Sequence, residues 1–243
     1  MERPWQENRL VKSVRMYCRQ NRVLISTCLI FLLFLVVRGG GRWSLLQQLN
    51  QVSHIAVVAA GMTVVVLAGE VDLSMGAVAA FASVMYAWLV AGGVWDVAAV
   101  AVTLLLCLAL GAVNGALVGL CRLPGFLITL LLSGGVSALS QTVSKGVSIG
   151  ISLADKRLIG LIRARVLGIP VPLLIVLAVY VIVAVMMNST KLGRSICAVG
   201  GNPGAARMSG LKPGWVKFRV FLVSAVCAGL GGIMFTLRLE AGI

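Results

Sequence analysis

Long apolar runs, separated by short clusters of charge, extend over most of this chain. A helix needs roughly 20 consecutive apolar residues to cross the hydrocarbon core of a bilayer. Hydrophobic residues make up 60% of the chain, whereas soluble domains contain about 45–50%. A soluble core of 243 residues could not cover that much apolar surface, but a bilayer replaces water around the outward faces. The sequence therefore predicts an all-α, polytopic membrane protein.

We expect about seven transmembrane helices, some of them short or broken, in one transmembrane domain over residues 23–243. The expected spans cover residues 23–37, 46–68, 74–91, 96–120, 124–142, 170–187 and 216–238. The first span is short, but the flanking Arg22 and Arg38 can extend their charges to the membrane surface.

Basic residues gather in the segment 1–22, directly before the first apolar run. No small-x-small cleavage motif follows that run, which favours a retained first span over a signal peptide. By the positive-inside rule the N-terminal segment is cytoplasmic, and seven alternating spans then place the basic loop 188–215 on the same side. The loop 143–169 falls outside by this count although it is also basic, so its location stays open. The segment 1–22 either contacts anionic lipid as a helix or only orients the chain.

The formal net charge of +14 would indicate nucleic acid as the partner of a soluble protein. Here the charges lie between apolar runs, so we expect membrane lipid and no nucleic acid as a partner. The six cysteines are scattered without a C-x-x-C pair and His54 is the single histidine, so we expect no metal site, cofactor or catalytic pair. The chain also lacks a G-x-x-x-x-G-K-[ST] motif, so any ATP hydrolysis requires a separate subunit.

An acidic turn, Gly69-Glu-Val-Asp-Leu-Ser-Met-Gly76, interrupts the apolar sequence between the second and third spans. A carboxylate at the bilayer centre costs about 2.5–3.5 kcal/mol even on the lenient insertion scale. Glu70 and Asp72 must therefore lie at an interface, in a protein-lined cavity or at a helix break. Asp72 or Ser74 also fits the N-cap of the third span. The turn is either a capped re-entry turn or part of a polar pathway, and these interpretations are compatible.

The fourth span carries Gly111, Gly115 and Gly119 at intervals of four residues. Small residues at this spacing let two helix backbones approach closely, either within the chain or between subunits. Asn114 on the same span is a candidate for a buried hydrogen bond between helices.

The loop 190–211 contains the signals of a short helix over about 203–209. Asn202 suits the N-cap, Pro203 the first helical position and Gly210 the C-terminal stop. This helix is either part of a structured loop or a docking element for a soluble partner.

Together these motifs resemble the permease subunits of sugar ABC importers of the ribose/xylose/galactose class. The acidic turn 69–76 resembles the family's G-x-[DE]-x-D-[LIV]-S-x-G turn, and Asn114-Gly115 with the segment 124–130 resembles its next signature. The segment 193–210 looks like the family's cytoplasmic coupling loop, and the glycine-rich segment 228–232 is similar too. The matches run in order over about residues 45–240.

The resemblance implies a bacterial inner-membrane importer for a monosaccharide or related small polar solute, in which this chain is not itself an enzyme. Two permease copies, identical or different, would assemble with two ABC ATPase subunits and an external sugar-binding protein. ATP-driven closure of the ATPase pair would switch access by pushing the loop 201–211. The implied ATPase-coupling residues are Gly201, Asn202, Pro203, Ala205, Ala206, Arg207, Ser209 and Gly210. The implied translocation-path or turn residues are Glu70, Asp72, Ser74, Asn114 and Thr129.

Three positions depart from the family pattern. Gly204 stands where an acidic residue is common, Cys197 where an aromatic is common, and the chain ends at Ile243 although family members continue for several spans. From this end we expect a C-terminally truncated permease, and a second interpretation stays open, a non-transporting remnant or membrane anchor. A third is a permease for another solute, such as branched-chain amino acids, whose importers share the general fold.

Overall fold

The computed structural model describes residues 26–27, 29–30, 45–151 and 157–243. The chain divides into two compact units, Met1–Leu45 and Leu46–Ile243. The expected basic segment 1–22 lies outside the described residues, as does most of the expected first span. Nearly all of the described residues belong to the second unit.

Helices account for nearly all of the second unit, as a polytopic membrane protein requires. Among the described residues, five helices are long and apolar enough to cross a membrane, and α4 is a shorter apolar helix of 17 residues. These six are α3 (Leu45–Leu67), α4 (Met75–Ala91), α5 (Asp96–Gly115), α6 (Gly125–Ser144), α8 (Val171–Ser189) and α11 (Pro213–Leu239). A π-helical turn, η1 (Ala116–Leu120), continues α5. The all-α prediction is confirmed, and these helices lie close to six of the seven expected spans.

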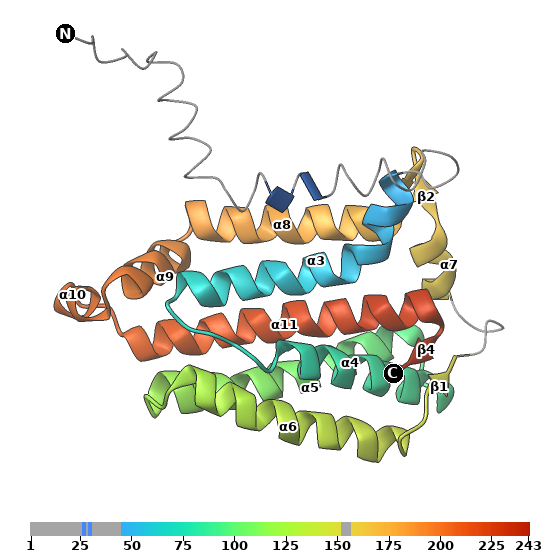
Figure 1. The fold of residues 1–243 in the computed structure, drawn as a ribbon, viewed down its shortest axis with the longest axis horizontal. Helices are drawn as coiled ribbons and strands as arrows, with labels where there is room; N and C mark the ends of the chain where they lie inside the picture. The colour runs from blue at the N-terminus through green and yellow to red at the C-terminus, as the bar shows by residue number, and fades with distance from the viewer. Residues whose placement is uncertain (1–25, 28, 31–44, 152–156) are drawn as a thin grey trace, which may run out of the picture. The chain divides into compact units, whose positions relative to one another are not determined.

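Consecutive spans run in opposite directions along the bundle (Figure 1). The connections α3–α4, α5–α6 and α8–α11 lie at one end, which we call the α10 end. The other connections, the short helix α7 (Arg157–Arg163) and the end of α11 lie at the opposite end, the α7 end.

Helix α11 forms the centre of the bundle and packs against α4 and α5. The three glycines at four-residue spacing on α5 and η1 face it directly. A Cβ atom added at Gly111 would lie 2.5 Å from the Cβ of Ala225, and one added at Gly119 would lie 2.4 Å from the carbonyl oxygen of Gly214. The glycine stripe therefore serves packing within the chain, because no larger side chain leaves room for α11.

Short paired strands order the connections at the α7 end. β1 (Ile149–Gly150) pairs antiparallel with β4 (Ala241–Gly242). β2 (Arg165–Val166) pairs with β3 (Ile169–Pro170) across a two-residue turn in which Leu167 and Gly168 both have positive φ. Positive φ at both central positions is the type I′ pattern that matches strand twist.

The loop 188–215 contains two helices where the sequence indicated one. α10 (Pro203–Met208) is the expected short helix, and α9 (Lys191–Gly201) was not predicted. Thr190 caps α9, since its Oγ1 accepts a hydrogen bond from the Gly193 amide at 3.2 Å. Gly193 and Gly200 lower the helix propensity of this segment, yet both allow close approach to other backbone. A Cβ at Gly200 would lie 1.9 Å from the carbonyl oxygen of Leu67.

Candidate functional site

The acidic turn is a break between two helices that returns into the bundle (Figure 1). α3 ends in a Schellman motif, with Gly69 at φ +76° and the Glu70 amide bonded to the Val65 carbonyl at 3.2 Å. Gly69 tolerates this left-handed conformation because it lacks a Cβ atom. The chain then runs back from the α10 end, and α4 starts part of the way along α11.

Asp72 lies inside the bundle and accepts three hydrogen bonds. Its Oδ1 accepts from the Ser74 amide at 2.9 Å and from the Ser74 hydroxyl at 2.6 Å. Its Oδ2 accepts from the Ser224 hydroxyl at 2.8 Å. Ser224 lies roughly 16 Å from the start of α11 at about 1.5 Å per residue, so the carboxylate is well below the bundle end. Hydrogen bonds replace the water that a buried carboxylate loses, since among the described residues no Lys or Arg pairs with it.

Asn114 and Thr129 join the same group from α5 and α6. The Asn114 side-chain amide donates to the Ser74 hydroxyl at 2.8 Å. Thr129 Oγ1 accepts from the Leu73 amide at 3.1 Å and donates to the Gly125 carbonyl at 2.9 Å. We call Asp72, Ser74, Asn114, Thr129 and Ser224 the polar junction. All five are buried, and they tie the helix break to α5, α6 and α11.

The N-cap residue of α4 is Ser74, one of the two expected residues, and not Asp72. Ser74 occupies the N-cap position, but its side chain makes no capping bond, and its φ of −83° and ψ of −14° are already helical. Its hydroxyl donates to Asp72, and Asp72 accepts from the Ser74 amide before the helix begins. The carboxylate thus stabilises the turn and not the first amides of α4.

Glu70 lies at the α10 end and does not join Asp72 and Ser74 of the same turn inside the bundle. Its carboxylate forms an ion pair with Lys217 of α11, and both side chains are mostly buried. Gly125 allows this arrangement, because a Cβ there would lie 2.3 Å from Glu70 Oε2. Lys217 and Ser224 are the functional-site residues that the sequence did not single out, since each meets its partner about 150 residues away.

The short helix α10 is rigidly attached on its inner side and exposed on its outer side. Asn202 Oδ1 accepts from the amides of Gly204 and Ala205 at 2.9 and 3.0 Å, which confirms the expected N-cap. Gly210, at φ +83°, closes the helix as expected. Ala206 is buried in a cluster that includes Ile196 and Val220. The remaining coupling candidates Gly201, Pro203, Ala205, Arg207 and Ser209 are exposed.

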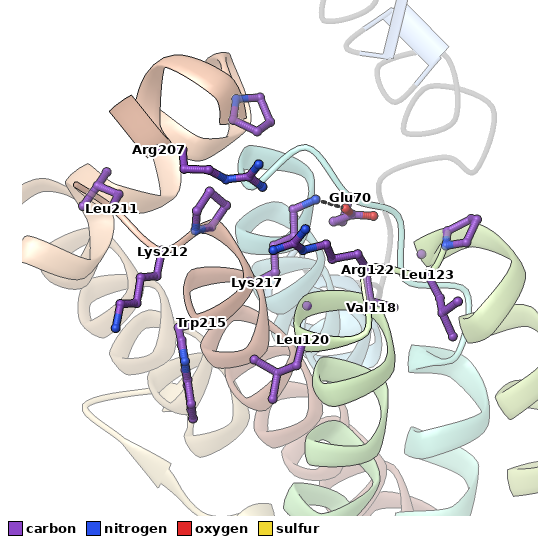
Figure 2. Close-up of a pocket in the computed structure, with 16 residues that line it drawn as sticks. Glu70, Val118, Leu120, Arg122, Leu123, Arg207, Leu211, Lys212, Trp215 and Lys217 are labelled. Atoms are coloured by element: carbon purple, nitrogen blue, oxygen red, sulfur yellow. Dashed lines mark hydrogen bonds and ion pairs between the residues drawn. The ribbon is translucent and has the colours of Figure 1, made fainter. Parts of the chain in front are cut away.

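A cavity of about 660 Å³ lies between α10 and the span ends (Figure 2). Glu70 borders it together with Pro203 and Arg207 of the α10 segment. The structure thus brings Glu70 of the acidic turn and the coupling candidates Pro203 and Arg207 to the same cavity. Figure 2 shows the Arg207 side chain turned toward Lys217 and Arg122.

Metal-binding groups are not brought together in the part of the chain that the structure describes. Within those residues no three His, Cys, Asp or Glu side chains are close enough to hold an ion. His54 packs beside Phe235, with ring centroids 4.9 Å apart.

The family model described as "Branched-chain amino acid transport system / permease component" matches residues 44–243. The chain is 33% identical over 200 residues to the ribose import permease protein RbsC of Escherichia coli strain K12, covering 82% of this chain and 62% of that protein. It is 36% identical over 205 residues to the D-allose transport system permease protein AlsC of the same strain, covering 80% and 60%. The L-arabinose ABC transporter permease protein AraH of Azospirillum brasilense is 31% identical over 194 residues, covering 80% and 57%. The chain therefore spans about three fifths of these relatives' length. No solved structure matches.

Proposed function

We propose, since this chain belongs to the family of branched-chain amino acid transport system permease components, that it is the membrane-spanning permease subunit of an ATP-driven ABC importer. Its relatives are named as permease components of transporters. In this proposal a separate ATPase subunit hydrolyses ATP, and the chain itself changes conformation.

A monosaccharide or a related small polar solute is the proposed cargo. The relatives are named for ribose, D-allose and L-arabinose. The family description names branched-chain amino acids, so these solutes form the competing class. An external binding protein delivers the solute, and a second permease copy, identical or different, completes the pathway.

The observation that carries the proposal is the mounting of α10. This helix is capped by Asn202, anchored through Ala206, and otherwise exposed at one end of the bundle. Met208 is 90% exposed at its tip. A short exposed helix on a rigid base suits a soluble partner that pushes it, and we assign this role to the ATPase.

Force on α10 has a packed route into the spans. α9 directly precedes α10, and Gly200 of α9 lies against the end of α3 next to the acidic turn. The Glu70–Lys217 ion pair ties the same turn to α11, and the polar junction ties it to α5 and α6. Bistable packing of such elements converts a small push into a change of access.

The α10 end is placed on the cytoplasmic side of the bacterial inner membrane. Seven of the described residues there are basic: Arg122, Lys191, Arg194, Arg207, Lys212, Lys217 and Arg219. The positive-inside rule favours the cytoplasm for such an end. With a cytoplasmic N-terminus, the six expected spans before the α8–α11 connection return the chain to the cytoplasmic side, which agrees with this placement.

Two matched substitutions test ATPase docking. Met208→Asp should weaken binding of the purified chain to its ATPase more than tenfold, because truncated or charged anchor positions cost about 2 kcal/mol or more at interfaces. Leu167→Asp is the control, since Leu167 is 97% exposed at the α7 end. Equal binding by both variants would show that α10 is not the docking element.

The solute class is tested by uptake into vesicles that contain the chain, its ATPase and its binding protein. ATP-dependent uptake of labelled ribose or another monosaccharide is expected, and labelled valine should not accumulate. Valine uptake alone would assign the amino-acid class. Uptake of neither would favour a non-transporting anchor.

A further inference from the structure

The cavity at the α10 end has an excess of positive charge that the described part of the chain does not neutralise. Arg122, Arg207, Lys212 and Lys217 border it, and Glu70 is the one carboxylate among its sixteen lining residues. Glu70 pairs with Lys217. Among the described residues, neither the Arg122 nor the Arg207 guanidinium has a hydrogen-bond or ion-pair partner.

Two of these cations point into the hollow. Figure 2 shows the guanidinium groups of Arg122 and Arg207 converging near the Lys217–Glu70 pair, while Lys212 extends along the rim. Arg122 has φ +59° two residues after the end of η1, in the tight connection between η1 and α6. Convergent cations in a concave site favour an anionic group with several acceptor oxygens, as phosphate has.

The cavity lies at the ends of helices that are long and apolar enough to cross a membrane. η1 ends at Leu120, α6 begins at Gly125 and α11 begins at Pro213, so three span ends form its wall. Its rim carries exposed Leu120, Leu123 and Trp215. Tryptophan beside apolar side chains is typical of the headgroup level, where one side of the ring is in lipid and the other in water.

We propose that this cavity holds the headgroup of an anionic phospholipid. The phosphate lies between Arg122 and Arg207, and the acyl chains leave past Leu120, Leu123 and Trp215. Basic pockets between transmembrane helices are known to suit such headgroups, and about 660 Å³ falls within the roughly 300–1,000 Å³ of small-molecule sites.

A lipid fits this hollow better than an acidic surface of the ATPase does. Arg207, although exposed, points toward Arg122 at the cavity, whereas Met208 and Gly204 of the same helix do not line the cavity. The exposed face of α10 therefore stays available to a protein partner while the lipid fills the hollow that Arg207 borders. This inference concerns the chain alone and does not depend on the proposed transport function.

The test uses Trp215 as the probe in the full-length chain, in vesicles of defined composition. Phosphatidylglycerol or phosphatidylcholine, each brominated near the headgroup, quenches tryptophan on contact. The Trp215 signal is the difference between the wild type and Trp215→Phe. We expect brominated phosphatidylglycerol to quench this signal several-fold more than brominated phosphatidylcholine at the same mole fraction.

Three double variants assign the preference to the cavity. Arg122→Gln with Arg207→Gln should abolish it, since each basic residue near a lipid surface contributes about fivefold, or at most about 25-fold for two. Arg122→Lys with Arg207→Lys should retain it, which shows that the fold tolerates change at these positions. Lys145→Gln with Arg165→Gln removes two exposed charges at the α7 end and should also retain it.

Several results would overturn the proposal. One is equal quenching by the two lipids, and another is a preference that survives the double glutamine variant. Loss of the preference in the α7-end variant would indicate general surface charge. Displacement of the brominated phosphatidylglycerol by millimolar inorganic phosphate would indicate a site for the free ion. If the wild type shows no lipid preference and the double glutamine variant loses ATPase binding, the cavity belongs to the protein partner.

Discussion

Replacement of Asp72 by alanine should destabilise the bundle more than any other single change in the acidic turn. The carboxylate accepts from the Ser74 amide, the Ser74 hydroxyl and the Ser224 hydroxyl at 2.6–2.9 Å. A hydrogen bond to a charged group contributes about 1.5–3 kcal/mol. The two hydroxyls can rotate to other acceptors, so we expect a loss of about 3–5 kcal/mol and not the full sum of three bonds.

Ser224→Ala and Ser140→Ala form a matched pair for the same site. Both serines are buried in spans, but Ser224 donates to Asp72 whereas Ser140 donates to the Val136 carbonyl of its own helix at 3.0 Å. Ser224→Ala should cost about 1.5–3 kcal/mol, since its bond reaches a charged acceptor, and Ser140→Ala should cost about 1 kcal/mol or less.

The assay is reversible unfolding of the purified chain in mixed detergent micelles, with helix content followed by circular dichroism. Expression level and monodispersity of each variant accompany it. The reasoning would be refuted by an Asp72→Ala variant within about 0.5 kcal/mol of wild type, the scatter of surface substitutions. A loss for Ser140→Ala equal to that for Ser224→Ala would also refute it.

Lys217→Met should cost about 1–3 kcal/mol in the same assay, because it leaves the mostly buried Glu70 carboxylate unpaired. The double exchange Glu70→Lys with Lys217→Glu should recover part of this stability. No recovery would count against a specific ion pair. Gly200→Ala should lower the thermal midpoint and expression, since its Cβ would meet backbone of α3, whereas Gly201→Ala has open space and should be neutral; similar midpoints for both would contradict the close approach. Asn202→Ala should reduce ATPase stimulation by the reconstituted chain, because it removes a helix cap that contributes about 1 kcal/mol. Asn202→Asp should preserve the stimulation. Unchanged stimulation in the alanine variant would show that the cap does not matter for coupling.

The polar junction shows where inference from sequence succeeded and where it stopped. Asp72 and Asn114 were selected because a polar side chain near an apolar run must find a partner in the bundle. Ser74 was selected as a possible N-cap, and Thr129 only through the family resemblance. The contacts among these four residues depend on helix packing, and so does the choice of Ser224, one of several small polar residues on the spans. Nothing in the local sequence around 224 distinguishes it.

Glycine explains the largest error in the α10 segment. Gly193, Gly200 and Gly201 lower the intrinsic helix propensity of the segment that forms α9, because each costs about 1 kcal/mol relative to alanine. The structure uses Gly193 and Gly200 for close contacts with neighbouring backbone. A glycine that weakens a helix and a glycine that permits a contact look identical in sequence, and only the partner's position separates them.

Local chemistry was enough to locate the spans and the turns along the chain. A run of apolar residues must be helical in lipid, two carboxylates must leave it, and Asn202 before Pro203 starts a helix wherever it lies. The destination of each carboxylate could be known only from the packed bundle. Asp72 lies inside the bundle and accepts hydrogen bonds from hydroxyl groups, whereas Glu70 lies at the bundle end and pairs with Lys217. Burial and charge pairing depend on the helices that meet at a point, and those helices come from positions about 150 residues apart.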